Sequence, residues 1–257
     1  MYTAELTFEC YQDTTITAVE RAISQYLEAL RYNGQILGRE FPTSMQEGVF
    51  VARVVCPEGD SVSERNHSLQ VKKLKALLHS AGVLEPKVRV TGQDLFSDHT
   101  DNCQERSWQI LFTTFLSTCS PLRCGEDFAP IPLYWLPEPV ANGDHKAVLK
   151  WQQEWCAADE LQMGGSVLEH ETLDELGTTQ SRLFRRGYDL AKRIAYISKT
   201  PTYYYLYRIG GASKEQELAR LCPRCGGEWR LEQPIHDIFD FKCDKCLLVS
   251  NLSWDFK

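Results

Sequence analysis

Cys222-Pro223-Arg224-Cys225 is separated by seventeen residues from Cys243-Asp244-Lys245-Cys246. Each Cys-x-x-Cys turn offers two thiolates, and a pair of strands between the turns can bring all four sulfurs to one centre. This is the spacing of a zinc ribbon, in which Zn²⁺ is bound by sulfur at about 2.3 Å. Gly226 directly follows the first turn, where a positive φ lets backbone N–H groups point at the sulfurs. The pattern predicts one zinc ion bound by Cys222, Cys225, Cys243 and Cys246.

The predicted ion has a structural role. Four sulfur ligands fill a tetrahedral zinc site, so no position stays open for water or a substrate. The alternative interpretation is two redox or incidental Cys-x-x-Cys motifs, but two such motifs at ribbon spacing favour a metal.

Chain length suggests more than one folding unit, because 257 residues exceed the usual size of a single domain. We expect an α+β core over residues 1–136, a helical segment with a Tyr-rich strand over 137–211, and the zinc ribbon over 212–257. The last part is too short to fold on apolar burial alone, so its metal would supply most of its folding free energy.

The first ninety residues alternate between period two and helical periodicity. Strands are expected over 2–10, 35–41, 49–56 and 87–91, and helices over 14–30 and 63–80. The order β-α-β-β-α-β is that of a ferredoxin-like split βαβ sandwich with both helices on one face of the sheet. Further elements are expected as additions to this core: a strand within 107–116, an edge strand or extended arm at 133–136, helices over 143–163 and 169–198, and a strand over 203–207.

Composition and charge bear on location and partners. The N-terminus has no basic and apolar leader, and no apolar run approaches eighteen residues, so we expect a cytoplasmic protein without a membrane partner. In that reducing compartment the other six cysteines are expected to be free thiols. The formal net charge of −7 repels polyphosphate, so any affinity for nucleic acid must come from a local basic surface.

One such surface is expected on the helix after residue 181. Residues 181–208 hold seven basic groups and one acidic group, whereas residues 137–180 hold nine acidic and two basic groups. On a helical projection the apolar stripe consists of Leu183, Gly187, Leu190, Ile194 and Ile197, and the opposite stripe of Arg182, Arg185, Arg186, Asp189 and Arg193.

The strand that follows places Tyr203, Tyr205 and Tyr207 on one face, since side chains alternate along a strand. The functional hypothesis is a phosphate-binding arginine ridge beside a tyrosine platform on which unpaired bases stack. The structural alternative is a solvated helix face and buried strand tyrosines, with the acidic segment neutralising the arginines.

Common catalytic motifs are missing from the sequence, including G-x-S-x-G, the P-loop, H-E-x-x-H and G-x-G-x-x-G. We therefore expect a protein that is not an enzyme. An enzyme with Cys124 as its nucleophile is the weakest of the alternatives, because no neighbouring base can be named.

The sequence resembles a bacterial family described as Zn-ribbon-containing, with a suggested role in nucleic-acid binding and otherwise uncharacterised. The resemblance lies in the segments Ser120–Gly125, Tyr203–Arg208, Cys222–Trp229, Phe241–Cys246 and Val249–Trp254. It implies zinc at the four cysteines named above. We expect a zinc-ribbon protein that binds RNA or a ribonucleoprotein; the alternative is a protein-protein interaction or adaptor module with a purely structural ribbon.

Overall fold

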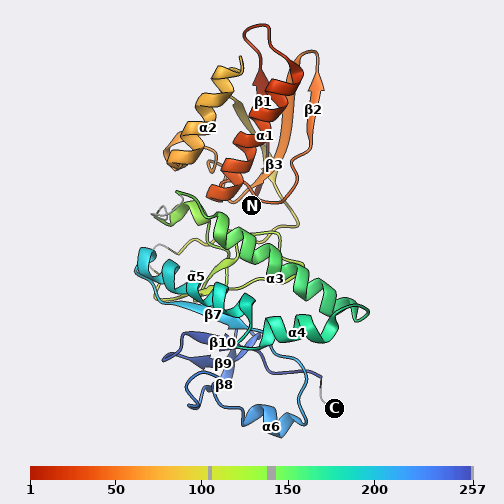
Figure 1. The fold of residues 1–257 in the computed structure, drawn as a ribbon. Helices are drawn as coiled ribbons and strands as arrows, with labels where there is room; N and C mark the ends of the chain where they lie inside the picture. Colours follow the sequence, from red (N-terminus) through yellow and green to blue (C-terminus); the bar gives the residue numbers. More distant parts are fainter. Residues whose placement is uncertain (104–105, 138–142, 256–257) are drawn as a thin grey trace. The chain divides into compact units, whose positions relative to one another are not determined.

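The computed structural model describes residues 1–103, 106–137 and 143–255 (Figure 1). The chain divides into two compact units. Unit 1 comprises residues 1–101, 118–120 and 129–146, and unit 2 comprises 102–117, 121–128 and 147–257. The three-part division expected from the sequence, at 136/137 and 211/212, stays a prediction. Among the described residues, no helix has the length and apolar character required to cross a bilayer.

Unit 1 has the predicted order β-α-β-β-α-β. Its elements are β1 (Tyr2–Glu9), α1 (Ile16–Asn33), β2 (Thr43–Gln46), β3 (Val49–Cys56), the 3-10 turn η1 (Glu64–Asn66), α2 (Leu69–Ser80), β4 (Lys87–Gln93) and the 3-10 turn η2 (Leu133–Trp135). The strands form one antiparallel sheet in the order β2-β3-β1-β4. This is the strand order of a split βαβ arrangement, in which β1 and β3 are central.

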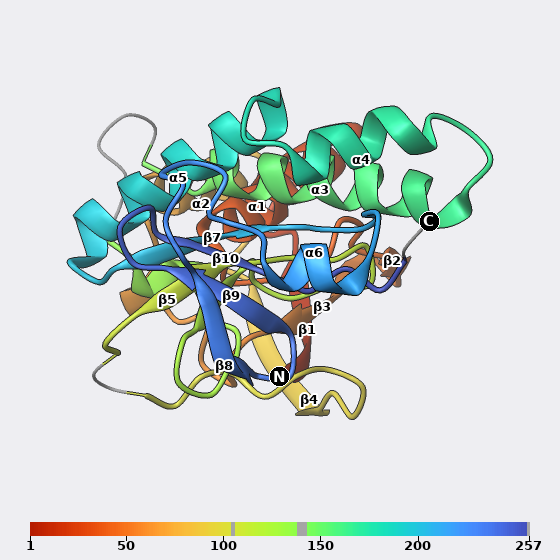
Figure 2. The ribbon, with the colours of Figure 1, turned by 90° about the horizontal axis from the view of Figure 1, so that it is seen from below.

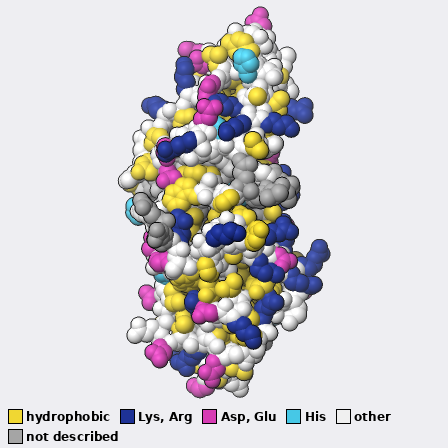
Figure 3. Space-filling view, turned by 90° about the vertical axis from the view of Figure 1, so that its left-hand side faces the viewer, with side chains coloured by type: hydrophobic (Ala, Val, Ile, Leu, Met, Phe, Trp, Pro, Cys, Tyr) yellow, Lys and Arg dark blue, Asp and Glu magenta, His cyan; other side chains and the backbone are white. Residues whose placement is uncertain are grey.

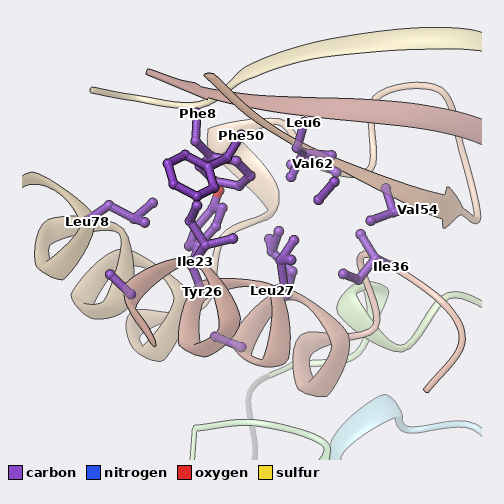
Figure 4. Close-up of a cluster of buried hydrophobic side chains, with 14 of the residues drawn as sticks. Leu6, Phe8, Ile23, Tyr26, Leu27, Ile36, Phe50, Val54, Val62 and Leu78 are labelled. Atoms are coloured by element: carbon purple, nitrogen blue, oxygen red, sulfur yellow. The ribbon is translucent and has the colours of Figure 1, made fainter. Parts of the chain in front are cut away.

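The core of unit 1 lies between the sheet and its two helices (Figure 4). Leu6 and Phe8 of β1 are fully buried, and they pair in register with Ala52 and Phe50 of β3. Successive strand side chains point to opposite faces, so these four residues share the face that α1 covers. The burial alternates along β1 and β3, as the period-two pattern of these segments does.

The ends of α1 follow from local sequence. Thr15 caps the first turn by accepting a hydrogen bond from the Ala18 amide at 3.3 Å. Gly34, with φ of 82°, ends the helix and donates its N–H to the carbonyls of Arg31 and Leu30. The left-handed conformation at this position favours glycine.

Two expected extended segments of unit 1 are wrong. Residues 35–41 form no strand; Leu37 makes a single bridge to Val55, and the edge strand is β2, a few residues later. Ile36 and Gln35 are buried there instead, and Gln35 donates to the Ser61 carbonyl at 2.7 Å. Residues 133–135 form the 3-10 turn η2 where an edge strand or arm was expected.

Unit 2 is built around a mixed six-stranded sheet with the order β6-β5-β7-β10-β9-β8. Its elements are β5 (Gln109–Leu111), β6 (Leu122–Cys124), α3 (Lys146–Gly164), α4 (Glu169–Gly177), α5 (Arg182–Ser198), β7 (Thr202–Leu206), α6 (Lys214–Leu218), β8 (Arg230–Ile235), β9 (Phe239–Cys243) and β10 (Leu248–Ser250). The strands of the cysteine-rich segment join those of the tyrosine-rich segment, because β10 pairs with β7 in parallel. Figure 2 shows α3, α4 and α5 grouped on one side of these strands.

The expected helix over 169–198 is divided into α4 and α5. Thr178 ends α4 in an extended conformation, and Ser181 starts α5 by accepting a hydrogen bond from the Phe184 amide at 3.0 Å. Serine is a favoured N-cap because its oxygen satisfies an amide that has no partner inside the helix. The break frees α5 to follow its own direction across β7.

Helix α5 packs closely on the strands at Gly187. A Cβ atom built there would lie nearer to Trp151 Nε1 and Tyr204 Cε2 than van der Waals contact permits. We therefore expect Gly187→Ala to lower the free energy of unfolding by about 1–3 kcal/mol, the usual effect of overpacking. The matched control is Gly164→Ala at the end of α3, where an added Cβ meets nothing within 4 Å. Chemical denaturation of both variants measures the difference, and equal stabilities would contradict the close approach.

Candidate metal centre and basic helix face

The two cysteine turns lie at the same end of the β8–β9–β10 strands. Cys243 is the last residue of β9, and Cys246 precedes β10 by two positions. The first turn is closed by two backbone hydrogen bonds of 2.9 Å, from the Cys222 amide to the Gly227 carbonyl and from the Gly226 amide to the Cys222 carbonyl. The sheet therefore brings together two cysteine pairs that seventeen intervening residues separate in the chain.

The four sulfurs form a compact group. The Sγ atoms of Cys222, Cys225, Cys243 and Cys246 all lie within 4.8 Å of one another, and those of Cys225 and Cys243 are 3.7 Å apart. A tetrahedron with metal–sulfur distances of about 2.3 Å has edges of about 3.8 Å. The group thus has the size that a tetrahedral metal site requires. The distance between the sulfurs of Cys225 and Cys243 is far longer than a disulfide bond, which is about 2.05 Å.

The thiols differ in their electrostatic surroundings. A hydrogen bond from the Gly227 amide, followed by smaller contributions from the other three thiols, lowers the pKa of Cys225 to about 7. Burial is the main cause that raises the pKa of Cys246 to about 12, and it also raises that of Cys243. Four thiolates in this space repel one another, and a bound cation would offset that repulsion.

The residue after each turn has the same backbone conformation. Gly226 has φ of 66°, as the sequence predicted, and Leu247 at the equivalent place has φ of 51°. A leucine adopts this left-handed region rarely, so the surrounding contacts must hold it there. One of them is the hydrogen bond of 2.9 Å from the Tyr204 amide to the Leu247 carbonyl, which joins the second turn to β7.

A small core supports the turns. Trp229 is 3% exposed, and its indole N–H donates to the Arg220 carbonyl at 2.9 Å. The Arg220 guanidinium lies 4.8 Å from the Trp229 ring centroid and 4.4 Å from that of Phe241. These contacts combine cation–π attraction with apolar burial.

Helix α5 contacts both cysteine turns through Tyr188. Its hydroxyl donates to the Cys246 carbonyl at 2.9 Å, and the Arg224 guanidinium lies over its ring at 4.3 Å from the centroid. A second tie runs from β7, where the Tyr203 hydroxyl donates to Asp244 Oδ1 at 2.7 Å. The candidate metal centre is therefore fixed to the helix that carries the predicted arginine ridge.

The arginines lie where the helical projection placed them. Arg182, Arg185, Arg186 and Arg193 are all exposed, while the stripe opposite them is buried at Leu183, Gly187, Leu190 and Ile194. Arg186 forms an ion pair with Glu154 of α3. Within residues 143–255, Arg182 and Arg193 have no acidic partner. Figure 3 shows Lys and Arg side chains on the surface together with hydrophobic ones.

The tyrosine platform is not available in this structure. Tyr203, Tyr205 and Tyr207 are each 5% exposed, because β7 lies inside the sheet with helices on it. Tyr205 packs against Phe112, Trp155 and Phe239. The pKa of each of the three hydroxyls is raised, and burial is the largest cause of the rise. Bases cannot stack on rings enclosed in this way.

Two tyrosines on α5 itself were not among the site residues predicted from the sequence. Tyr196 is 75% exposed, and Tyr188 is half-buried beside the cysteine turns. Lys192 and Lys199 lie over their rings, at 4.9 Å from Tyr188 and 4.2 Å from Tyr196. The signal was present in the spacing, since residues 188, 192 and 196 are four apart and share one side of a helix.

Cys124 is poorly suited to act as a nucleophile. Its side chain is fully buried in β6, and the thiol donates to Glu126 Oε2 at 3.0 Å. Burial raises the pKa of this thiol well above its ordinary value. A thiol that keeps its proton is a weak nucleophile.

Three family models match successive parts of the chain. Residues 103–207 match a domain of unknown function (DUF2310), and residues 1–92 and 211–256 match two further domains of unknown function (DUF8589 and DUF8594). An uncharacterized protein of Haemophilus influenzae is 43% identical over 250 residues, which cover 95% of each chain. A second one from the same organism is 48% identical over 177 residues, covering 68% of this chain and 86% of its own.

The comparison with solved structures is weaker. A Deinococcus radiodurans protein, named as a candidate antibiotic biosynthesis monooxygenase, is 10% identical and covers 39% of this chain and 100% of its own, with a TM-score of 0.28. This likeness carries no argument about function. The Haemophilus influenzae relatives do show the family: the chain belongs to an uncharacterised bacterial family that includes these proteins, and its residues 103–207 match the DUF2310 domain.

Proposed function

We propose that the four cysteines hold one structural zinc ion. The size of the sulfur group, with 3.7 Å between two sulfurs, and its all-thiolate chemistry support zinc over harder cations, which prefer oxygen ligands. The ion would cross-link β8, β9 and β10 at the ends of the sheet. With all four tetrahedral positions occupied by sulfur, it would stabilise the fold without reacting with substrates.

We further propose that the protein is not an enzyme and binds single-stranded RNA, free or in a ribonucleoprotein, through the exposed arginines of α5. The observation that carries this proposal is the junction at Tyr188, which holds an exposed basic helix beside the cysteine turns. Unpaired arginines are suited to phosphates because their planar donors match the phosphate oxygens. A local basic surface of this kind can bind a polyanion although the whole chain carries −7.

Charge reversal on α5 tests the RNA proposal. In the variant Arg182→Glu, Arg186→Glu, Arg193→Glu, the slope of log affinity against log salt should fall by about 2, because each lost phosphate contact on a single strand removes about 0.7. The measurement is fluorescence anisotropy of a labelled single-stranded RNA at several salt concentrations. The matched control reverses three exposed charges of unit 1, Arg21, Lys72 and Lys73, and should keep the slope.

The wild-type titration decides the proposal first. Absence of saturable binding at low salt would remove the RNA function altogether. Saturable binding with an unchanged slope in the triple variant would show that the arginines of α5 are not the contact.

A protein-interaction module is the second candidate, and the ion pairs on α5 favour it. Glu154 pairs with Arg186, and Asp189 pairs with Lys192 at 2.9 Å, so acidic groups neutralise part of the ridge. Affinity capture with and without nuclease separates the two candidates. Partners that stay bound after nuclease treatment would favour the interaction module.

A further inference from the structure

Helix α5 carries a row of alternating rings and cations, which we call the Tyr196 row. Its members are Tyr188, Lys192, Tyr196 and Lys199, with Arg224 joining it from the first cysteine turn. Positions four apart on a helix lie one above the other, so the row runs along one side of α5 for about 12 Å between Tyr188 and Tyr196. It lies beside the arginines and is distinct from them.

The two rings in the row differ in their contacts and in their exposure to solvent. Tyr188 is stacked on Phe184 with ring centroids 5.4 Å apart, and its hydroxyl donates to the Cys246 carbonyl. These contacts hold the Tyr188 ring in place within the fold. Tyr196 is 75% exposed and has only the Lys199 ammonium group over it. Among the ring–ring contacts of the described residues, none involves Tyr196. Tyr196 is therefore the ring in the row that a ligand can reach.

We infer that single-stranded RNA stacks a base on Tyr196 and runs along α5 to the first cysteine turn, where Arg224 receives a phosphate. This inference rests on the proposed function and adds to it the ring that contacts bases. A base stack is stronger than an exposed cation–π contact, so a base would displace Lys199 from the ring. The released ammonium group, with Lys192, then faces the phosphates on either side of the stacked base.

The cysteine turns have a part in this path. Arg224 lies between the proposed ligands Cys222 and Cys225 in the chain, and its guanidinium lies over the Tyr188 ring. The Tyr188 hydroxyl donates a hydrogen bond to the Cys246 carbonyl in the second turn. The turns thus set where the row ends. Asp189 pairs with Lys192 and lies next to the row, so a phosphate must compete with it for that ammonium group.

The test uses the full chain and two probes. One probe is a labelled oligouridylate of about twelve nucleotides, within the range that stacking platforms cover, and the other is a ribose-phosphate strand of equal length without bases. For Tyr196→Ala we expect about a 5- to 100-fold loss of affinity for oligouridylate and no change for the strand without bases. Tyr196→Phe keeps the ring and should bind as the wild type does.

Tyr11→Ala is the matched control, because Tyr11 is an exposed tyrosine of unit 1 at 43% and should leave both affinities unchanged. Equal losses for both probes in Tyr196→Ala would overturn base stacking. Unchanged affinity for oligouridylate in Tyr196→Ala, with a normal response of the arginine variant, would overturn this inference alone. Failure of the wild type to bind either probe would overturn the proposed function and this inference with it.

Discussion

Replacing Cys243 with serine is expected to abolish stoichiometric zinc binding and to unfold β8, β9 and β10. Structural zinc in small modules contributes about 10–16 kcal/mol of apparent binding free energy, which is comparable to the whole stability of a typical domain, about 5–15 kcal/mol. Cys243 ends the central strand of the hairpins, and its sulfur is 3.7 Å from that of Cys225. Removal of one ligand therefore frees the end at which all three strands meet.

Elemental analysis and hydrogen exchange measure the two effects separately. The wild type should contain about one zinc per chain. Amides of 230–250 should exchange much faster in Cys243→Ser than in the wild type. The matched control is Cys10→Ser, because Cys10 is an exposed thiol of unit 1 and should change neither result. Zinc retained in Cys243→Ser would contradict the four-cysteine site, and zinc lost without faster exchange would contradict its structural role.

The sequence predicted those features that depend on local periodicity. Period-two alternation identified β1 and β3 as strands, and the spacing of the cysteines identified the four sulfurs that the structure brings together. The amphipathic pattern of α5 identified which arginines are exposed. Each of these signals is contained in a short stretch of chain, so no knowledge of distant contacts was needed.

The sequence could not predict features that depend on which elements become neighbours. Period two placed Tyr203, Tyr205 and Tyr207 on one face of a strand, but not whether that face would be covered. Pairing of β7 with both β5 and β10 makes it an interior strand, and α3 and α5 cover it, so all its residues are buried. Residues 35–41 show the same limit of prediction from sequence. Ile36 is buried beside the sheet, so the segment has the apolar pattern of a strand although only one bridge, from Leu37 to Val55, pairs it with the sheet.

The continuous sheet of unit 2 changes what the cysteine segment can do. An isolated ribbon would present only its own tips, and residues 212–257 carry seven basic and eight acidic groups, which is a poor surface for phosphates. Pairing of β10 with β7, and the contacts of Tyr188, bring the turns against the basic helix instead. The metal would then act on binding indirectly, by holding α5 and the turns in one arrangement.

Replacing Glu217 with alanine is the second change from which we expect a large effect. Its carboxylate is 6% exposed and accepts hydrogen bonds from Arg208, with Nε 3.1 Å from each oxygen, while Arg220 Nε lies 3.3 Å from Oε2. Burial lowers the pKa of Arg220 to about 10, which still leaves it charged at neutral pH. The variant would leave that buried charge without its main counter-ion, Glu217, at a cost of about 3–5 kcal/mol.

Two further variants separate charge from position. Glu217→Gln keeps an acceptor for both arginines and should lose less stability than Glu217→Ala, because only the charge is removed. Glu215 lies on the exposed side of α6, so Glu215→Ala should change the free energy of unfolding by no more than about 0.5 kcal/mol. Urea denaturation and hydrogen exchange of β9 and β10 would report the losses. Arg220 also packs on Trp229 and Phe241 beside the cysteine turns, so Glu217→Ala should weaken zinc binding as well. The measurement is zinc retention in the presence of a chelator. Equal retention in the variant and the wild type would contradict this coupling.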